Sequence, residues 1–185
     1  MISLGSGGAA APSFDHPLEM LHACHGKIQQ QLNTLQKIAT HLPVHGCDQQ
    51  VQQAAQGILR YFDTAGQFHH QDEEENLFPT LLALNVPEKA QVEALIERLL
   101  AQHAIMFAAW SEVRAVLVEL AEGINTPLPE TLIEKLVGSY TPHIELEEAE
   151  LLTLSARLLS PQQIMTLGRS MAERRGAKFP PLPAA

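Results

Sequence analysis

Histidine and glutamate recur at a fixed spacing in two stretches of the sequence. Residues 69–79 read HHQDEEENLFP, and residues 143–153 read HIELEEAELLT. Aligned without gaps, they share His at the first position, Glu at the fifth and sixth, and Leu at the ninth. Residues four apart lie on one face of a helix, so His69 with Glu73, and His143 with Glu147, would direct a nitrogen and a carboxylate into one small volume. Such pairs are typical of metal sites.

A lone histidine precedes each motif. His25 lies 44 residues before His69, and His103 lies 40 residues before His143. The chain therefore resembles two helical hairpins in series, each with one lone histidine and one His-x-x-x-Glu motif. Both motifs continue apolar helix faces, so we expect the six side chains to meet in the interior. Unpaired carboxylates are costly there, which favours neutralisation by metal cations over a satisfied polar core.

The donor set predicts the class of metal. Four imidazoles and two carboxylates, without thiolate, suit iron, manganese or zinc better than copper(I) or an iron–sulfur cluster. Two bridging glutamates and two histidines per cation would give each cation four protein ligands. A bridging oxide or hydroxide adds a fifth, and a six-coordinate iron keeps a position open for a small diatomic. We expect two non-haem iron ions, with manganese or zinc as the less favoured alternatives.

The elements that must position these residues are helices. Apolar residues recur at intervals of three and four, and no strand-like alternation is present. The pattern predicts helices over 17–42, 48–85, 87–122 and 129–159, with Pro43 and Gly46 ending the first and Asp48 capping the second. Ser160 to Gln163 is a capping box that opens a short fifth helix. These segments predict an all-α fold, an up-down-up-down antiparallel four-helix bundle with a short C-terminal helix.

Composition bounds the domain organisation and the partners. We expect a flexible N-terminal segment over 1–13, the bundle over 14–159, the extra helix over 160–175 and a proline-rich tail over 176–185. Twelve Lys and Arg against 21 Asp and Glu give a net charge of −9, which argues against nucleic acid or an anionic membrane surface as a partner. Two cysteines and no apolar membrane-length segment indicate a cytoplasmic protein.

Other residues near the six could support the site. His70 and Glu74 repeat the His-x-x-x-Glu spacing one residue along, rotated by about 100° on a regular helix, so His70 is expected in the surroundings of the metal or in solvent. His22 lies one turn from His25. Tyr140 could hydrogen-bond a bound oxygen species or simply fill the core, and Phe107 could line the pocket or pack.

These motifs resemble the hemerythrin-like (HHE cation-binding) family. The matching elements are His25 in LHACHGKI, His69 and Glu73 in HHQDEEENLFP, His103 in LLAQHAIMF, and His143 and Glu147 in YTPHIELEE. The resemblance covers about residues 14–159 and implies a four-helix bundle around a non-haem di-iron centre. Oxygen-carrying members place a second histidine four residues after the third-helix ligand, where this chain has Phe107. The resemblance therefore implies stress-repair or sensor-type members rather than carriers.

Three functions follow as hypotheses. The first is a di-iron protein that binds or reacts with oxygen, nitric oxide or peroxide, in stress response, sensing or iron handling. The second is a structural or regulatory binding module in which the metal only staples the bundle, without redox chemistry. The third is an enzyme proper, such as a peroxidase or a nitric-oxide reductase. Neither a protein partner nor the choice of diatomic follows from the sequence. The ferritin-like carboxylate family needs two Glu-x-x-His motifs, and the chain has one, Glu19 to His22.

Overall fold

A computed structural model describes residues 13–179, and the fold over these residues is all-α, as predicted. Residues 1–12 of the expected N-terminal segment and 180–185 of the expected tail lie outside the described residues. The helical elements are α1 (Pro17–His45), α2 (Gln49–Tyr61), α3 (Gln67–Gln71), α4 (Phe78–Leu82), α5 (Lys89–Ala121), α6 (Glu130–Leu146), α7 (Leu152–Leu158) and α8 (Pro161–Arg174). Three π-helical turns join them, η1 (Phe62–Gly66), η2 (Asp72–Leu77) and η3 (Glu147–Leu151).

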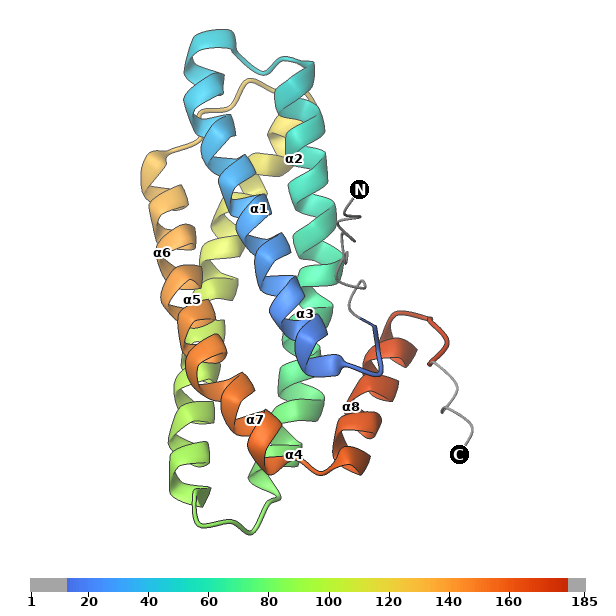
Figure 1. Ribbon diagram of the computed structural model, residues 1–185. Helices are drawn as coiled ribbons and strands as arrows, with labels where there is room; N and C mark the ends of the chain where they lie inside the picture. The colour runs from blue at the N-terminus through green and yellow to red at the C-terminus, as the bar shows by residue number, and fades with distance from the viewer. Residues whose placement is uncertain (1–12, 180–185) are drawn as a thin grey trace, which may run out of the picture.

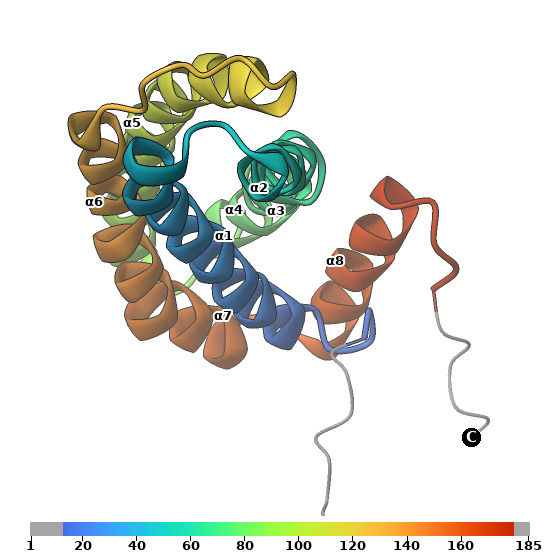
Figure 2. The same cartoon turned by 90° about the horizontal axis from the view of Figure 1, so that it is seen from above.

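Four long rods build the bundle, because the π-turns link α2 to α4 and α6 to α7 without a break. The four rods run alternately up and down and enclose a common interior, with α8 against one side (Figures 1 and 2). The first rod contacts the second and fourth, and α5 contacts the same two. This arrangement confirms the predicted antiparallel four-helix bundle with a short C-terminal helix.

Local sequence signals fix most helix ends. Asp48 caps α2, since its carboxylate accepts the Val51 N–H at 3.0 Å. Ser160 and Gln163 form the predicted capping box of α8. The prediction that Pro43 helps to end the first helix is wrong, because α1 continues to His45. Proline removes only one donor this close to a C-terminus, and the Gly46 N–H, at φ 72°, still bonds Leu42 O at 2.9 Å.

The π-turns η2 and η3 occur at equivalent places in the two motifs. η2 contains Glu73, and η3 begins at Glu147. A π-turn closes an i→i+5 hydrogen bond and so adds one residue to a turn, which changes the face that neighbouring side chains occupy. In the second rod, His69, His70, Asp72 and Glu73 are all buried. On a regular helix these four positions span about 160°, so a broad face of the second rod lies in the interior here.

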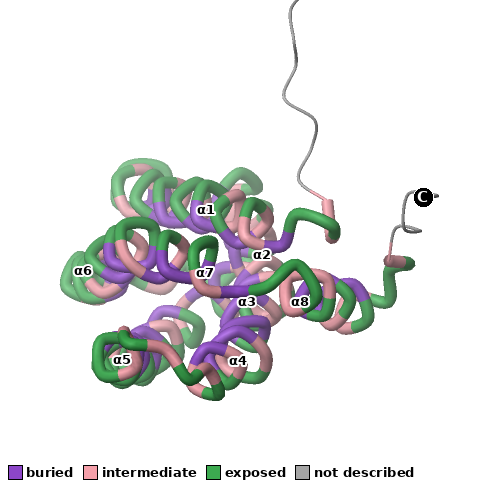
Figure 3. Tube along the Cα trace, turned by 60° about the horizontal axis from the view of Figure 1, so that its bottom comes forward, coloured by how far each residue is buried: buried purple, intermediate pink, exposed green. Residues whose placement is uncertain are grey.

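The apolar core is divided into two clusters. The loop-end cluster lies toward the connections after α1 and α5 and includes Leu35, Ile58, Phe62, Val113 and Leu136. The α8-end cluster includes Leu21, Leu77, Phe78, Leu99 and Met171. Figure 3 shows buried stretches along the rods and on part of α8. Both clusters therefore hold the four rods together, one on each side of the middle of the bundle.

Helix α8 docks against the start of α1 and against η2. Gly168 is buried where α8 meets the segment before α1, and a Cβ at this position would lie 1.8 Å from the Phe14 carbonyl oxygen. Only glycine permits this close approach. Asp72, which is fully buried in η2, pairs with Arg174 and Arg175 at the end of the C-terminal helical segment. A close backbone contact at Gly168 thus fixes α8 beside the start of α1, and a buried ion pair fixes it beside the second rod.

Among residues 13–179, no helix is both long enough and apolar enough to cross a membrane.

Candidate metal centre

A polar layer separates the two apolar clusters. Along α1 the order is Leu21, His25, Ile28, and along α5 it is Leu99, His103, Met106, with the outer residues in opposite clusters. The second and fourth rods contribute the two His-x-x-x-Glu motifs to the same layer. The structure brings together all six residues of the predicted ligand set, each at most 2% exposed: His25, His69, Glu73, His103, His143 and Glu147.

The two carboxylates each span two histidine neighbours. In Glu73, Oε1 lies 3.5 Å from His69 Nε2 and Oε2 lies 3.5 Å from His103 Nε2. In Glu147, Oε2 lies 3.0 Å from His25 Nε2 and Oε1 lies 3.2 Å from His143 Nε2. One oxygen of each glutamate thus faces the His25 and His69 side, and the other faces the His103 and His143 side. This is the arrangement expected of carboxylates that bridge two cations.

Within residues 13–179, most polar atoms of this layer have no hydrogen-bond partner. They are His25 Nε2, both ring nitrogens of His69, His70 Nε2 and all four carboxylate oxygens of Glu73 and Glu147. The short nitrogen–oxygen distances given above do not have hydrogen-bonding geometry at these atoms. Buried polar groups are rarely left unpaired, since each such group costs about 1–3 kcal/mol. Unpaired nitrogen and oxygen atoms that face one volume fit a bound cation.

Outer hydrogen bonds orient three of the four histidines. His25 Nδ1 donates to Glu148 Oε1 at 3.0 Å, His103 Nδ1 to Glu74 Oε1 at 2.6 Å, and His143 Nδ1 to Gln102 Oε1 at 3.1 Å. Because these oxygens accept, the proton lies on Nδ1 and the Nε2 lone pair faces the interior. Metal-binding histidines are typically held this way.

Two of these inward nitrogens face each other. His103 Nε2 and His143 Nε2 are 3.2 Å apart. With both Nδ1 atoms protonated, two lone pairs meet at this distance, which is unfavourable unless a positive charge lies between or beside them. The donor set of the layer therefore fits a cation on this side as well as on the His25 and His69 side.

Burial sets the charges of the metal-free layer. It lowers the pKa of His69 to about 3, although Glu147 acts in the opposite direction. Burial, followed by the repulsion of Glu147, raises the pKa of Glu73 well above its usual range. Burial also opposes ionisation of Glu147, but its contacts with His143 and His25 lower its pKa well below the usual range. Burial thus favours the neutral form of the Glu73 carboxyl group, and a cation beside it would favour the ionised, metal-binding form.

The structure places the supporting residues at different depths. His70 is buried, with its ring centroid 4.5 Å from that of His103. Tyr140 is buried in the loop-end cluster, 6.2 Å from the His70 ring. Phe107 is 43% exposed and packs edge-on against His70. His22 is on the surface, with Nδ1 3.0 Å from Glu148 Oε1. His22 therefore lies outside the polar layer and contacts the carboxylate that orients His25.

A cleft of about 460 Å³ reaches the layer from outside. Its walls come from the second rod, α5 and α6, and include His70, Glu74, Phe107, Trp110 and Tyr140. A small molecule in this cleft would meet aromatic side chains and then the buried histidines. Glu74 connects the cleft to the site, since it also accepts the hydrogen bond from His103.

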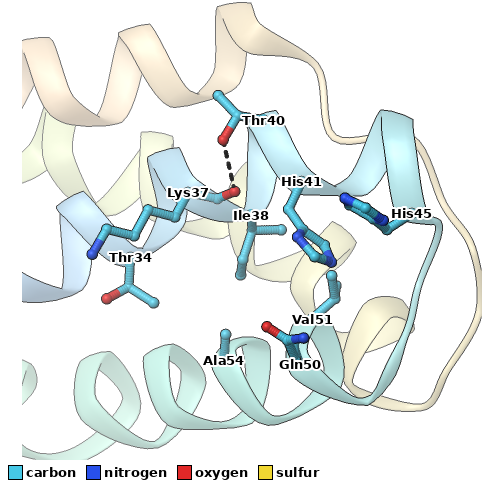
Figure 4. Close-up of a pocket in the computed structure, with 9 residues that line it drawn as sticks. All are labelled: Thr34, Lys37, Ile38, Thr40, His41, His45, Gln50, Val51 and Ala54. Atoms are coloured by element: carbon cyan, nitrogen blue, oxygen red, sulfur yellow. Dashed lines mark hydrogen bonds between the residues drawn. The ribbon is translucent and has the colours of Figure 1, made fainter.

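A second groove lies between α1 and α2 at the loop end (Figure 4). His41 and His45 stack there with ring centroids 4.3 Å apart, and His41 bonds Asp48. His41 is 16 residues beyond His25 on one helix, which places it about 24 Å away along the axis. None of the residues that line this groove is a carboxylate. The groove is thus separate from the polar layer.

Sequence reasoning missed two orienting residues, Gln102 and Glu148. Glu148 carried a signal, because the aligned motifs share the glutamate at the sixth position as well as the fifth. Glu74 and Glu148 both occupy that sixth position, and each bonds the lone histidine of the other hairpin. Gln102 carried no comparable signal, because nothing in the sequence relates it to His143.

The fold and the site define a class: an antiparallel four-helix bundle with buried His and Glu groups able to hold metal. The hemerythrin HHE cation binding domain matches residues 16–155. The chain therefore belongs to the hemerythrin HHE cation-binding domain family, as its motifs predicted. It is also similar to a protein of Haemophilus influenzae described as an uncharacterized protein, with 32% identity over 166 residues, covering 90% of this chain and 94% of the relative.

Proposed function

We propose that the protein binds two iron ions in the polar layer. His25 and His69 bind one ion, His103 and His143 bind the other, and Glu73 and Glu147 bridge them. The observation that carries this proposal is the division of each carboxylate, one oxygen toward each histidine pair. The nitrogen and oxygen donors favour iron, with manganese or zinc less favoured.

We propose further that the centre binds or reacts with oxygen, nitric oxide or peroxide, in stress response, sensing or iron handling. A pair of iron ions supplies reversible electron exchange and open coordination positions. The protein supplies a buried layer between two apolar clusters, histidines held with Nε2 inward, and a cleft wide enough for small molecules. Aromatic side chains such as Phe107 and Trp110 line part of the cleft, and Glu74 and Glu75 line another part. This combination favours small uncharged ligands over anions.

The test begins with metal content. Protein purified from iron-supplemented cells should contain two iron ions per chain and develop near-ultraviolet charge-transfer bands after oxidation. His69→Ala should abolish loading of two ions, because it removes a nitrogen donor that has no other partner. His41→Ala is the matched control, since His41 lies in the distant groove. Equal loading of the two variants would contradict the site assignment.

The second measurement distinguishes redox-active iron from a metal that only stabilises the bundle. Reduced protein should change its spectrum on addition of oxygen, nitric oxide or hydrogen peroxide. If the isolated protein contains redox-silent zinc and gives no such change, the metal only stabilises the bundle. Repeated turnover with an electron donor would instead indicate an enzyme rather than a stoichiometric binder.

A further inference from the structure

His70 is a buried histidine that the proposed ligand set does not use. Its side chain is 4% exposed, and its Nε2 atom has no hydrogen-bond partner. It follows His69 directly in α3, so it projects about 100° around the helix axis from that residue. This rotation takes it from the His25 side of the layer, where His69 lies, to the side formed by α5 and α6.

The contacts of His70 place it on one side of the site. Its ring centroid lies 4.5 Å from that of His103 and 6.3 Å from that of His143. One nitrogen from each of these three histidines lies within 4.8 Å of the others, which is close enough for one ion to bind all three. His25 does not belong to this group.

Packing holds His70 in this position. Phe107 meets its ring edge-on, with centroids 5.0 Å apart and planes at 82°. Tyr140 lies on another side, at 6.2 Å. The ring therefore stands between the aromatic cleft and the polar layer, and its buried Nε2 has no polar partner in either aromatic neighbour. Because this nitrogen makes no hydrogen bond to the described residues, its lone pair is free to bind a cation.

We infer that His70 is the third imidazole ligand of the ion held by His103 and His143. The inference rests on the proposed di-iron function and adds a ligand to it. That ion would then have three nitrogen and two carboxylate oxygen donors, whereas the ion at His25 and His69 would have two nitrogens and two oxygens. The two ions are therefore inequivalent.

His70→Ala tests this assignment, with His45→Ala as the matched control because His45 is exposed and lies in the groove at the loop end. Both variants should keep native far-ultraviolet circular dichroism. At saturating iron, His70→Ala should still take up two ions, since the other six ligands remain. Its affinity for one of the two ions should fall by at least about 10-fold.

Mössbauer spectra of iron-57 protein then report ligation directly. The native protein should give two quadrupole doublets of equal area, and His70→Ala should change one of them while His45→Ala changes neither. Because the cleft leads to this position, added imidazole should enter the vacated space and restore the native doublet. A merely structural role would not give this rescue.

Two results would overturn the inference and are distinguishable from failure of the proposed function. If native protein takes up two irons but His70→Ala has an unchanged spectrum and affinity, His70 is not a ligand. If the variant spectrum changes but imidazole does not restore it, His70 acts only by packing. If native protein does not take up two irons at all, it is the di-iron proposal itself that fails.

Discussion

His103 donates from Nδ1 to Glu74 Oε1 at 2.6 Å, although the two residues belong to different helical hairpins. Glu148 accepts from His25 in the reciprocal way at 3.0 Å. In each hairpin, the first glutamate of the motif faces the interior and the second orients the lone histidine of the other hairpin. The weak internal repeat therefore has a structural meaning, since neither hairpin contains a complete site.

Removal of these outer carboxylates should weaken metal binding without removing a ligand. Glu74→Ala and Glu148→Ala should each lower iron affinity by about 10- to 100-fold, because the histidine loses the bond that fixes its proton and its orientation. Competition titration with a chelator of known affinity measures the change. Glu145→Ala, an exposed glutamate on α6, is the control and should leave the affinity unchanged. Equal affinities in all variants would show that orientation by these carboxylates does not matter.

Chelation of the metal should lower the melting temperature but leave the protein folded at 25 °C. A ligand that binds only the native state at about 100 times its Kd stabilises by about 2.7 kcal/mol, which corresponds to roughly 5–10 °C for a chain of this size. Neither apolar cluster contains a metal-binding residue, so the two clusters should still hold the bundle together after the metal is removed. Differential scanning calorimetry with and without chelator gives the shift. Complete loss of helical circular dichroism on chelation would contradict this expectation.

Asp72 should contribute more to stability than the neighbouring Glu75, although both pair with Arg174. Asp72 is fully buried and also pairs with Arg175, whereas the Glu75 side chain is 58% exposed. Asp72→Asn should therefore destabilise the metal-free protein by about 2 kcal/mol, and Glu75→Gln by less than about 1 kcal/mol. Urea unfolding in the presence of chelator measures both. Similar values for the two variants would mean that burial does not strengthen the attachment of α8.

Asp48 should titrate below its ordinary pKa of 3.8, because hydrogen bonds from His41 and from the Val51 N–H favour the carboxylate. A lowered pKa in the folded state gives a stabilising contribution that is present above about pH 3.8 and is lost as the pH falls through the lowered value. His41→Ala should raise the pKa of Asp48 toward 3.8 and shift that loss to higher pH. Carbon-13 titration of the Asp48 carboxyl group measures the shift. An unchanged pKa would show that His41 does not stabilise the carboxylate.

The sequence was informative about the fold wherever the determinants are local. Asp48 and the Ser160–Gln163 capping box mark helix starts because they satisfy nearby N–H groups. The apolar spacing predicted the helices because a regular helix buries every third or fourth residue. Pro43 was misleading, since its effect depends on how much helix follows it, and only two residues of α1 do.

The candidate site was predictable only as far as regular helices describe it. In each His-x-x-x-Glu motif, the histidine and the glutamate face the same layer, as four-residue spacing on a helix predicts. The position of His70 was not predictable, since it depends on α5 and α6 lying beside the face of α3 next to His69. Gln102 and the buried Asp72 depend on which rod lies beside which, and this is a property of the tertiary structure alone.

The division of the core into two clusters has a consequence for how metal enters and leaves the polar layer. Apolar contacts hold the rods together on both sides of the histidine layer. The metal site is therefore preorganised, and an incoming ion needs little rearrangement of the backbone. Release and capture can then proceed through side-chain adjustments alone, while the scaffold around them stays still.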